Sequence, residues 1–311
     1  MLRGALLGWR DVRAYYCDHF VLPLPEGHRF PMEKYRLLRE RVAAAAIAAL
    51  HVPEAATKEE LERVHTVDYV SRAYCGTFSN DEVRRIGFPF SAELVERARR
   101  SVGGTISASK AALEDGVAVN LAGGTHHGFA EHGEGFCVFN DVAVAVRAHQ
   151  AVDTASRFSV LDLDVHQGNG TAKIFADDET VFTLSVHGEN NSPFRKEASD
   201  LDLDLPDGCA DQRYLDTADY GIRAALAHTP DLAFYLAGAD PYEHDRLGRL
   251  AVTKEGLAER DRLVFDRCAR AGVPVAVVMS GGYAADVTDT VDIHENTVRA
   301  AAQQATVGVL A

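Results

Sequence analysis

The segment DLDVH, residues 162–166, places two carboxylates and an imidazole at alternate positions. If a strand runs through it, Asp162, Asp164 and His166 share one face of that strand. Buried like charges are costly without a compensating cation, and carboxylates with an imidazole suit zinc or a similar divalent ion. A lone motif of this kind is more often a polar strand end, so a third ligand is needed, and Asp240 after another apolar run could supply it. Three protein ligands leave one coordination position open, as in a catalytic zinc site.

Two adjacent histidines, His126 and His127, follow a pair of glycines. Adjacent histidines cannot easily both bind one metal, but both can line a cleft if each has an orienting partner on its second nitrogen. Asp162 and Asn169 are candidate partners. A carboxylate partner favours the charged imidazolium, whereas an amide leaves the histidine nearer neutral and able to accept a proton. Taken alone, a histidine pair in a glycine-rich loop more often has a surface or hydrogen-bonding role.

Two aromatic residues could complete a site of this kind. Tyr283 follows Ser280 and two glycines, which would let its phenol turn toward a substrate carbonyl and donate to an oxyanion. Phe136, within GEGFCVFN at residues 133–140, could form an apolar wall beside the site. Packing is the default role for either side chain, so each is weak evidence in isolation.

The bulk composition of the 311 residues excludes some classes of partner. A net charge of −14 argues against nucleic acid or an anionic membrane, and it tolerates cationic substrates without requiring them. The five cysteines are scattered and never spaced as CxxC, which fits free thiols in a reducing cytosol. No apolar run approaches the ~20 residues of a membrane helix, and the first eleven residues are not expected to be a signal peptide. We therefore expect a soluble, cytoplasmic protein.

The elements that must position these residues alternate along the chain. No linker or repeat divides the sequence, so residues 1–311 are expected to form one domain. Apolar runs without polar alternation predict buried strands at Val117–Leu121, Phe158–Leu163, Val181–Val186, Leu232–Ala237 and Val273–Met279. Longer periodic segments predict helices at Ala92–Glu114, Val142–Asp153, Gln212–Leu226 and Thr253–Ala271. The fold class is thus α/β, a parallel β-sheet flanked by helices on both faces, and ligands gather at the carboxyl ends of such strands.

Taken in chain order, the segments after these strands resemble the histone deacetylase family, which has the arginase/deacetylase fold. The resemblance extends from GHRFP at residues 27–31 to the helix after Tyr283. The motifs that carry it are GGTHHG (123–128), GEGFCVFND (133–141), DLDVHQGNG (162–170), GADPYEHDRLG (238–248) and SGGY (280–283). Finer features are similar to the class IV branch and its bacterial amidohydrolase relatives: VHT (64–66), GGTI (103–106), HQGNG (166–170), DRLG (245–248) and RDRLVF (260–265).

The resemblance implies a role for each matching position. Asp164, His166 and Asp240 match the zinc ligands. His127 matches the general base and acid, with Asn169 where its partner lies, and His126 matches the second histidine, paired with Asp162. Tyr283 matches the tyrosine that polarises the substrate carbonyl.

The resemblance also implies an acyl channel and monovalent cation sites. Gly135 and Phe136 match one wall of the channel. The opposite wall is normally an aromatic residue before a proline, but Ser192 stands there, so the channel is wider or Phe194 replaces the ring. At the foot of the channel, Lys34 stands where many relatives have arginine. The residues that match a potassium or sodium site are Asp162, Asp164, His166, Ser185 and, through its carbonyl, Val186, with Phe175 and Val181 matching carbonyl donors of a second site.

The expected activity is that of a zinc-dependent amidohydrolase, with iron(II) also compatible with the ligands. It would remove an acetyl or longer acyl group from an acylated lysine of a peptide or protein, or from a similar amine. Acetylpolyamines and other small acylated amines are the nearest alternative, mildly disfavoured because no long insertion narrows the channel. Ureohydrolase chemistry with two manganese ions is disfavoured by Asn169 and Tyr283. A non-catalytic acyl-lysine binding protein would be expected to have lost one of the chemical residues. The oligomeric state stays open.

Overall fold

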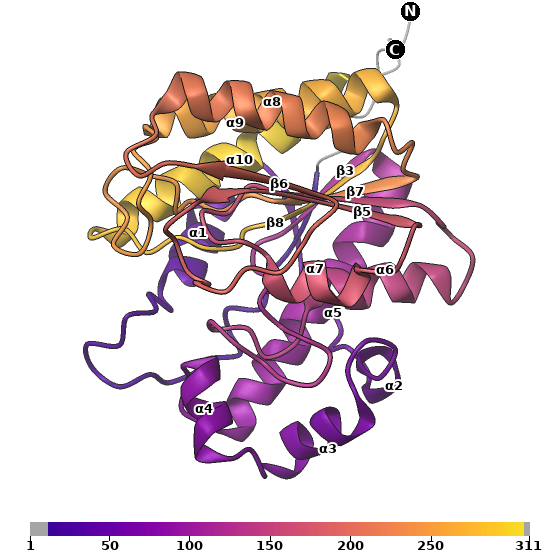
Figure 1. The fold of residues 1–311 in the computed structure, drawn as a ribbon, viewed down its shortest axis with the longest axis vertical. Helices are drawn as coiled ribbons and strands as arrows, with labels where there is room; N and C mark the ends of the chain where they lie inside the picture. Colours follow the sequence, from indigo (N-terminus) through magenta and orange to yellow (C-terminus); the bar gives the residue numbers. More distant parts are fainter. Residues whose placement is uncertain (1–11, 308–311) are drawn as a thin grey trace, which may run out of the picture.

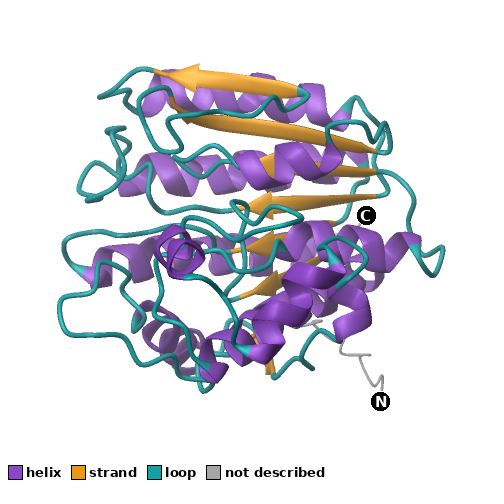
Figure 2. Cartoon of the chain, turned by 60° about the horizontal axis from the view of Figure 1, so that its bottom comes forward, coloured by secondary structure: helices purple, strands orange, loops and turns teal. Residues whose placement is uncertain are grey.

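The computed structural model describes residues 12–307, which contain one sheet of eight parallel strands. The strands are β1 (Arg13–Tyr15), β2 (Ala49–His51), β3 (Val117–Asn120), β4 (Phe158–Asp162), β5 (Val181–Gly188), β6 (Leu201–Leu205), β7 (Leu232–Leu236) and β8 (Val275–Val278). Their order across the sheet is β2-β1-β3-β8-β7-β4-β5-β6. Figure 2 shows these strands running side by side between the helices.

Helices cover both faces of the sheet. They are α1 (Lys34–Ala45), α2 (Lys58–Leu61), α3 (Val67–Cys75), α4 (Asn80–Ile86), α5 (Ala92–Asp115), α6 (Asp141–Gln150), α7 (Asn169–Phe175), α8 (Asp211–Leu226), α9 (Lys254–Ala271) and α10 (Val287–Val307). Helices α1, α8, α9 and α10 form one layer, and α5, α6 and α7 form the other, with α2, α3 and α4 beyond it (Figure 1). None of the helices among residues 12–307 is long and apolar enough to cross a membrane.

The central strands are apolar at successive positions because each face of the sheet packs against a helical layer. In β7, Ala233 and Tyr235 belong to the core under α8 and α9, whereas Phe234 and Leu236 belong to the core on the α5 side. All five residues of this strand are buried. Such two-sided burial is typical of parallel sheets in α/β proteins.

The α/β fold class and all five predicted strands are confirmed, with small differences at their ends. The four predicted helices are also present, and Thr253 caps the start of α9 because its hydroxyl accepts from the Gly256 amide at 3.0 Å. The strand predicted to reach Leu163 ends at Asp162, and the helix predicted to reach Asp153 ends at Gln150. The predicted single domain of residues 1–311, and the interpretation of the first eleven, extend beyond the described residues and stay predictions.

Candidate active site

The candidate chemical residues lie in loops that leave four neighbouring strands. In the sheet, β3, β8, β7 and β4 are adjacent in that order, and all are parallel. Their carboxyl ends therefore meet at one edge, where ligands of open α/β sheets bind. The loops after these strands carry, respectively, His126 with His127, Tyr283, Asp240, and Asp164 with His166.

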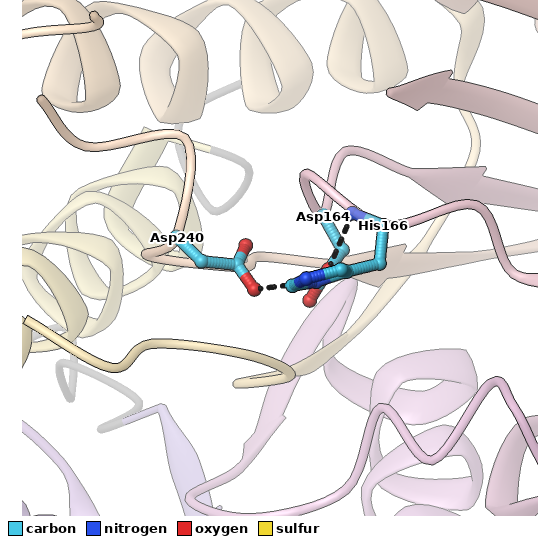
Figure 3. A group of neighbouring side chains, drawn as sticks. All are labelled: Asp164, His166 and Asp240. Carbon is cyan, nitrogen blue, oxygen red and sulfur yellow. Dashed lines mark hydrogen bonds and ion pairs between the residues drawn. The ribbon is translucent and has the colours of Figure 1, made fainter. Parts of the chain in front are cut away.

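Three of these side chains converge on one point (Figure 3). His166 Nδ1 lies 3.0 Å from Asp164 Oδ1 and 3.1 Å from Asp240 Oδ2. One possible ligand atom from each residue lies within 4.8 Å of the others, and all three residues are buried. The three predicted metal ligands thus come together in the structure.

The condition under which alternation would place Asp162, Asp164 and His166 on one strand face is not met, because β4 ends at Asp162. The aspartates themselves shape the loop that follows. The Asp164 amide donates to Asp162 Oδ1 at 3.2 Å, and the His166 amide donates to Asp164 Oδ1 at 2.9 Å. Aspartates commonly bend the backbone in this way by accepting from the amide two residues on. Successive side-chain turns, rather than strand alternation, therefore aim Asp164 and His166 at Asp240.

The electrostatics of this cluster suit a bound cation. Burial and the neighbouring Asp164 raise the pKa of Asp240 to about 7. Burial also opposes the charged form of Asp164, but His126 and His166 outweigh it and lower the pKa of Asp164 well below its ordinary value. Two buried carboxylates with a shared imidazole form a donor set that fits zinc or a similar divalent metal. The residues present therefore fit the metal that the sequence predicts.

The outer oxygens of the two carboxylates are held in place by other groups. Asp164 Oδ2 accepts from Ser280 Oγ at 2.7 Å and from the Gly281 amide at 2.8 Å. Asp240 Oδ1 accepts from the Val165 amide at 3.0 Å. Position 281 must lack a side chain, since a Cβ there would lie 1.9 Å from Asp240 Oδ2. Such surrounding contacts fix the orientation of ligands before a metal binds.

The two adjacent histidines have different partners. His126 Nδ1 lies 2.6 Å from Asp162 Oδ2, and His127 Nδ1 lies 2.7 Å from Asn169 Oδ1. Asn169 Oδ1 also accepts from the Gly170 amide, and its Nδ2 donates to Glu134 Oε1 at 3.2 Å. This pattern makes Asn169 Oδ1 the acceptor, so the His127 proton sits on Nδ1 and Nε2 carries the lone pair.

Because their partners differ, the two histidines have different pKa values. Although burial opposes it, Asp162 and Asp164 raise the pKa of His126 to about 9. Burial and the charges of His126 and His166 lower the pKa of His127 well below 6.5. The carboxylate partner therefore favours the charged form of His126, whereas the surroundings of His127 favour its neutral form.

Tyr283 completes the group from the loop after β8. Its ring lies edge-on to the ring of His166, with 6.3 Å between centroids, and 6.0 Å from the ring of Phe136. Its amide donates to Asp245 Oδ2 at 2.5 Å, which fixes the backbone at this turn. Burial, with Asp240 and Asp164 nearby, raises the pKa of the phenol well above 10. The hydroxyl thus keeps its proton and can act as a donor.

A cavity of about 270 Å³ reaches these residues, and His127, His166 and Tyr283 are among those that line it. The four predicted channel residues also line it, namely Gly135, Phe136, Ser192 and Phe194. Phe194 is 87% exposed, so it lies at the rim rather than within a closed wall. A larger hollow of about 710 Å³, between the segment before α1 and the start of α10, contains none of the predicted site residues. The smaller cavity is therefore the candidate active site.

One wall of this cavity is pinned to the end of α4. Gly135 and Phe136 both have positive φ, +54° and +67°. An aromatic residue rarely adopts this left-handed backbone, so neighbouring contacts must impose it. The Gly135 amide donates to the Arg85 carbonyl at 3.1 Å, and the Phe136 amide donates to the Ile86 carbonyl at 2.7 Å. The last turn of α4 thus holds the Phe136 ring against the cavity.

Lys34 lies behind the loop that carries Tyr283. Its Nζ donates to the Ser280 and Gly282 carbonyls, both at 3.3 Å, and lies 5.2 Å from the centroid of the Tyr283 ring. Burial lowers the pKa of Lys34 to about 8. The lysine predicted at the foot of the channel therefore supports this loop through backbone carbonyls.

Three of the residues predicted for a monovalent cation lie on two neighbouring strands. Asp162 and Ser185 are register partners in the neighbouring strands β4 and β5, and Val186 follows in β5. All three are buried. Phe175 ends α7, and Val181 begins β5. The assignment of these residues to cation binding stays a prediction.

Comparison with known proteins identifies the family. The histone deacetylase domain matches residues 28–298, so the chain belongs to this family. It is 48% identical to an uncharacterized protein of Picosynechococcus over 92% of this chain and 97% of the other. It is 33% identical to histone deacetylase 2 of Arabidopsis thaliana over 76% of this chain and 63% of that protein.

Two solved structures show the same fold. The HD domain of HDA15 superimposes with a TM-score of 0.80 at 22% identity, covering 97% of this chain and 94% of that one. The acetylpolyamine aminohydrolase of Burkholderia pseudomallei gives a TM-score of 0.76 at 20% identity, covering 92% of this chain and 97% of that one. The arginase/deacetylase architecture expected from the motifs is therefore confirmed, whereas the finer resemblance to the class IV branch stays a prediction.

Sequence reasoning missed the residues that hold the loops in place. Asp141, at the start of α6, accepts from the Gly124 amide at 3.0 Å and the Thr125 amide at 2.7 Å, which fixes the loop before the histidine pair. Ser280 donates to the predicted metal ligand Asp164, and Asp245 accepts from the Tyr283 amide. All three belong to motifs quoted above, but a carboxylate or hydroxyl that bonds to backbone has no spacing of its own to reveal it.

Proposed function

We propose that this protein is a zinc-dependent amidohydrolase that removes an acetyl or longer acyl group from an acylated lysine side chain or a similar amine. One observation carries the proposal: His166 of the buried Asp164–His166–Asp240 cluster lines the same cavity as His127, whose surroundings favour its neutral form, and Tyr283, whose phenol keeps its proton. Membership of the histone deacetylase family supports a hydrolase of this type.

A divalent metal held by Asp164, His166 and Asp240 would polarise the amide carbonyl and lower the pKa of a water molecule. In the proposed mechanism, His127 Nε2 accepts the proton of the attacking water, since Nδ1 already carries a proton donated to Asn169. His127 then returns that proton to the departing nitrogen, which leaves as an amine. A histidine that is neutral at the start suits both transfers.

The neighbouring groups would stabilise the charge that develops. The Tyr283 hydroxyl donates to the oxyanion of the tetrahedral intermediate, and its raised pKa keeps the donated proton on the phenol. His126, charged through Asp162, stays protonated throughout and adds positive potential beside His127. The two histidines therefore have distinct roles, one in proton transfer and one electrostatic.

The cofactor and location are part of the proposal. Iron(II) would suit the same ligands as zinc, so metal analysis of the purified protein has to distinguish them. Potassium or sodium would bind near Asp162 and Ser185. A cytoplasmic location is supported by the cysteines, which are free among the described residues, as expected in a reducing compartment.

The test is hydrolysis of a panel of acyl-lysine peptides, from acetyl to long fatty acyl, with and without chelator. We expect chelator-sensitive turnover that returns with zinc. Tyr283→Phe should lower kcat by on the order of 10²–10³, the usual effect of removing one oxyanion donor. Full activity of Tyr283→Phe would contradict the assigned role. Turnover of small acylated amines alone would favour the alternative of an acetylpolyamine-type substrate, and acyl-lysine binding without any turnover would favour a binding protein.

A further inference from the structure

The mouth of the candidate active site is basic, although the whole chain has a net charge of −14. Four arginines line this cavity, Arg29, Arg84, Arg85 and Arg249. None of the described residues that line it is an aspartate or a glutamate. We propose that this rim is an anion subsite, and that the natural substrate carries a carboxylate or another anionic group on the amine portion of its amide. The inference rests on the proposed function for the reaction itself.

Three separate segments bring the four arginines to the cavity. Arg84 and Arg85 belong to the last turn of α4, whose carbonyls hold the wall of the channel. Arginines in the last turn of a helix also complement the helix dipole, so these two alone would be weak evidence. Arg29 precedes α1 and Arg249 follows β7, and no helix end explains either of them. The dipole of α4 does not explain why arginines from three separate segments line the same cavity.

The backbone around Arg29 is firmly held. His28 Nε2 lies 3.0 Å from the Gly87 carbonyl oxygen, and its Nδ1 accepts from the Phe30 amide at 3.1 Å. The Phe30 ring packs against the ring of Phe136, with centroids 5.2 Å apart. Arg29, between these two anchored residues, is itself exposed. Its guanidinium is therefore tethered at the mouth of the cavity and free to contact a bound molecule.

Two of the four arginines have ion-pair partners, and the other two are available to bind an anion. Arg84 pairs with Asp81, and Arg249 lies 3.3 Å from Asp207, and both pairs are exposed. Among the described residues, neither Arg29 nor Arg85 has an ion-pair partner, and both are exposed. An exposed guanidinium without a partner can offer a carboxylate two parallel hydrogen bonds. Arg29 and Arg85 are therefore the residues that we assign to the anion.

The position of the rim tells which part of the substrate bears the charge. The reacting amide must reach His127, His166 and Tyr283 at the inner end of the cavity. With a short acyl group, the part of the substrate that extends to the mouth is the amine portion. A polycationic amine would bring its positive charges to the arginines, which opposes binding. The rim thus favours an acylated amino acid with a free carboxylate, or an acyl-lysine flanked by acidic residues, over an acylated polyamine.

The test compares three zinc-loaded forms of the protein, the wild type and two double variants, on matched substrates and ligands. The substrates are an Nα-capped Nε-acetyl-lysine with a free carboxylate, the same compound as its carboxamide, and a monoacetylated diamine. The variant is R29Q/R85Q. The control is R223Q/R270Q, which removes the same charge from α8 and α9 in the opposite layer (Figure 1). Binding is measured in parallel with a linear hydroxamate that ends in a carboxylate and with its carboxamide, since binding does not require that the amide be cleaved.

We expect the wild type to prefer the carboxylate over the carboxamide, both in kcat/KM and in Kd. That preference should fall about fivefold in R29Q/R85Q, the effect of two exposed charge contacts, and should be unchanged in R223Q/R270Q. It should also weaken as salt is raised.

The remaining outcomes distinguish the anion subsite from the proposed amidohydrolase activity. Hydrolysis with no preference for the carboxylate, or with a preference that R29Q/R85Q retains, would overturn the anion subsite and leave the amidohydrolase intact. The fastest turnover on the acetylated diamine would do the same. No hydrolysis of any substrate, together with hydroxamate binding that prefers the carboxylate and depends on Arg29 and Arg85, would support the subsite and overturn the proposed function.

Discussion

Replacing Asn169 by aspartate should raise the pKa of His127, and the chain contains its own comparison for the size of the effect. His126 and His127 are adjacent and buried, and each is hydrogen-bonded through Nδ1, at 2.6 Å and 2.7 Å. The partner is a carboxylate for His126 and an amide for His127. The pKa of His126 is about 9, whereas the pKa of His127 is well below 6.5. The substitution would give both histidines the same kind of partner.

The expected change in rate follows from the fraction of neutral His127. A carboxylate this close to an imidazole commonly raises its pKa by about 1–3 units. If the pKa of His127 reached that of His126, about 9, roughly one molecule in a hundred would hold it neutral at pH 7. Since the proposed base must be neutral to accept a proton, kcat/KM at pH 7 should fall, by up to about hundredfold if the pKa of His127 reaches that of His126. The loss should shrink as the pH rises, because the acid limb of the profile moves upward.

The experiment needs a control for the contact between Asn169 and Glu134. Asn169 Nδ2 donates to Glu134 Oε1 at 3.2 Å, so Asn169→Asp alone would bring two carboxylates together. The profiles of kcat/KM against pH are therefore measured for N169D, E134Q and N169D/E134Q, with the metal content of each. An acid limb that stays at the wild-type position in the metal-loaded double variant would refute the reasoning. An equal loss at every pH would instead indicate that His127 had moved.

The parts of the fold that could be predicted are those in which burial produces a recognisable pattern of apolar residues in the sequence. The predicted strands are apolar on both faces because helical layers cover them, and this produces continuous runs. The two edge strands, β2 and β6, and β1 next to β2 have no such apolar run. Strands β1 and β2 have three residues each, too few for a period, and β6 alternates Leu with partly exposed Asp at the edge of the sheet. The carboxyl ends of the predicted strands were sufficient to locate the site.

The residue types at the site and their partners could be predicted, but the backbone geometry that brings them together could not. Strand alternation is not what aligns Asp164 with His166, because side-chain turns take the chain out of the sheet. The cluster of arginines at the mouth of the cavity could not be predicted from the sequence, for a different reason. Arg29, Arg85 and Arg249 are separated by long stretches of chain, and a lone surface arginine has no pattern, so only the folded structure brings them to one cavity.

Two further predictions concern the metal cluster and the pH dependence of stability. Gly281→Ala should weaken metal binding by roughly 10- to 100-fold, because its Cβ would displace Asp240, a proposed metal ligand. Gly272→Ala, whose Cβ contacts nothing, should lower only the stability, and metal titration of both folded variants tests this. The pKa of His65 is lowered to about 4 by burial, and its two nitrogens bond the Phe129 carbonyl and the Asn140 amide, so the folded state keeps it neutral. Because the unfolded chain binds this proton below pH 6.5 and the folded chain does not, the free energy of unfolding should fall by roughly 2–3 kcal/mol between about pH 6.5 and pH 4. In urea unfolding, the free energy of unfolding of His65→Gln should fall less over that pH window, although this variant is less stable overall. An equal fall in both proteins would assign the acid sensitivity to other groups.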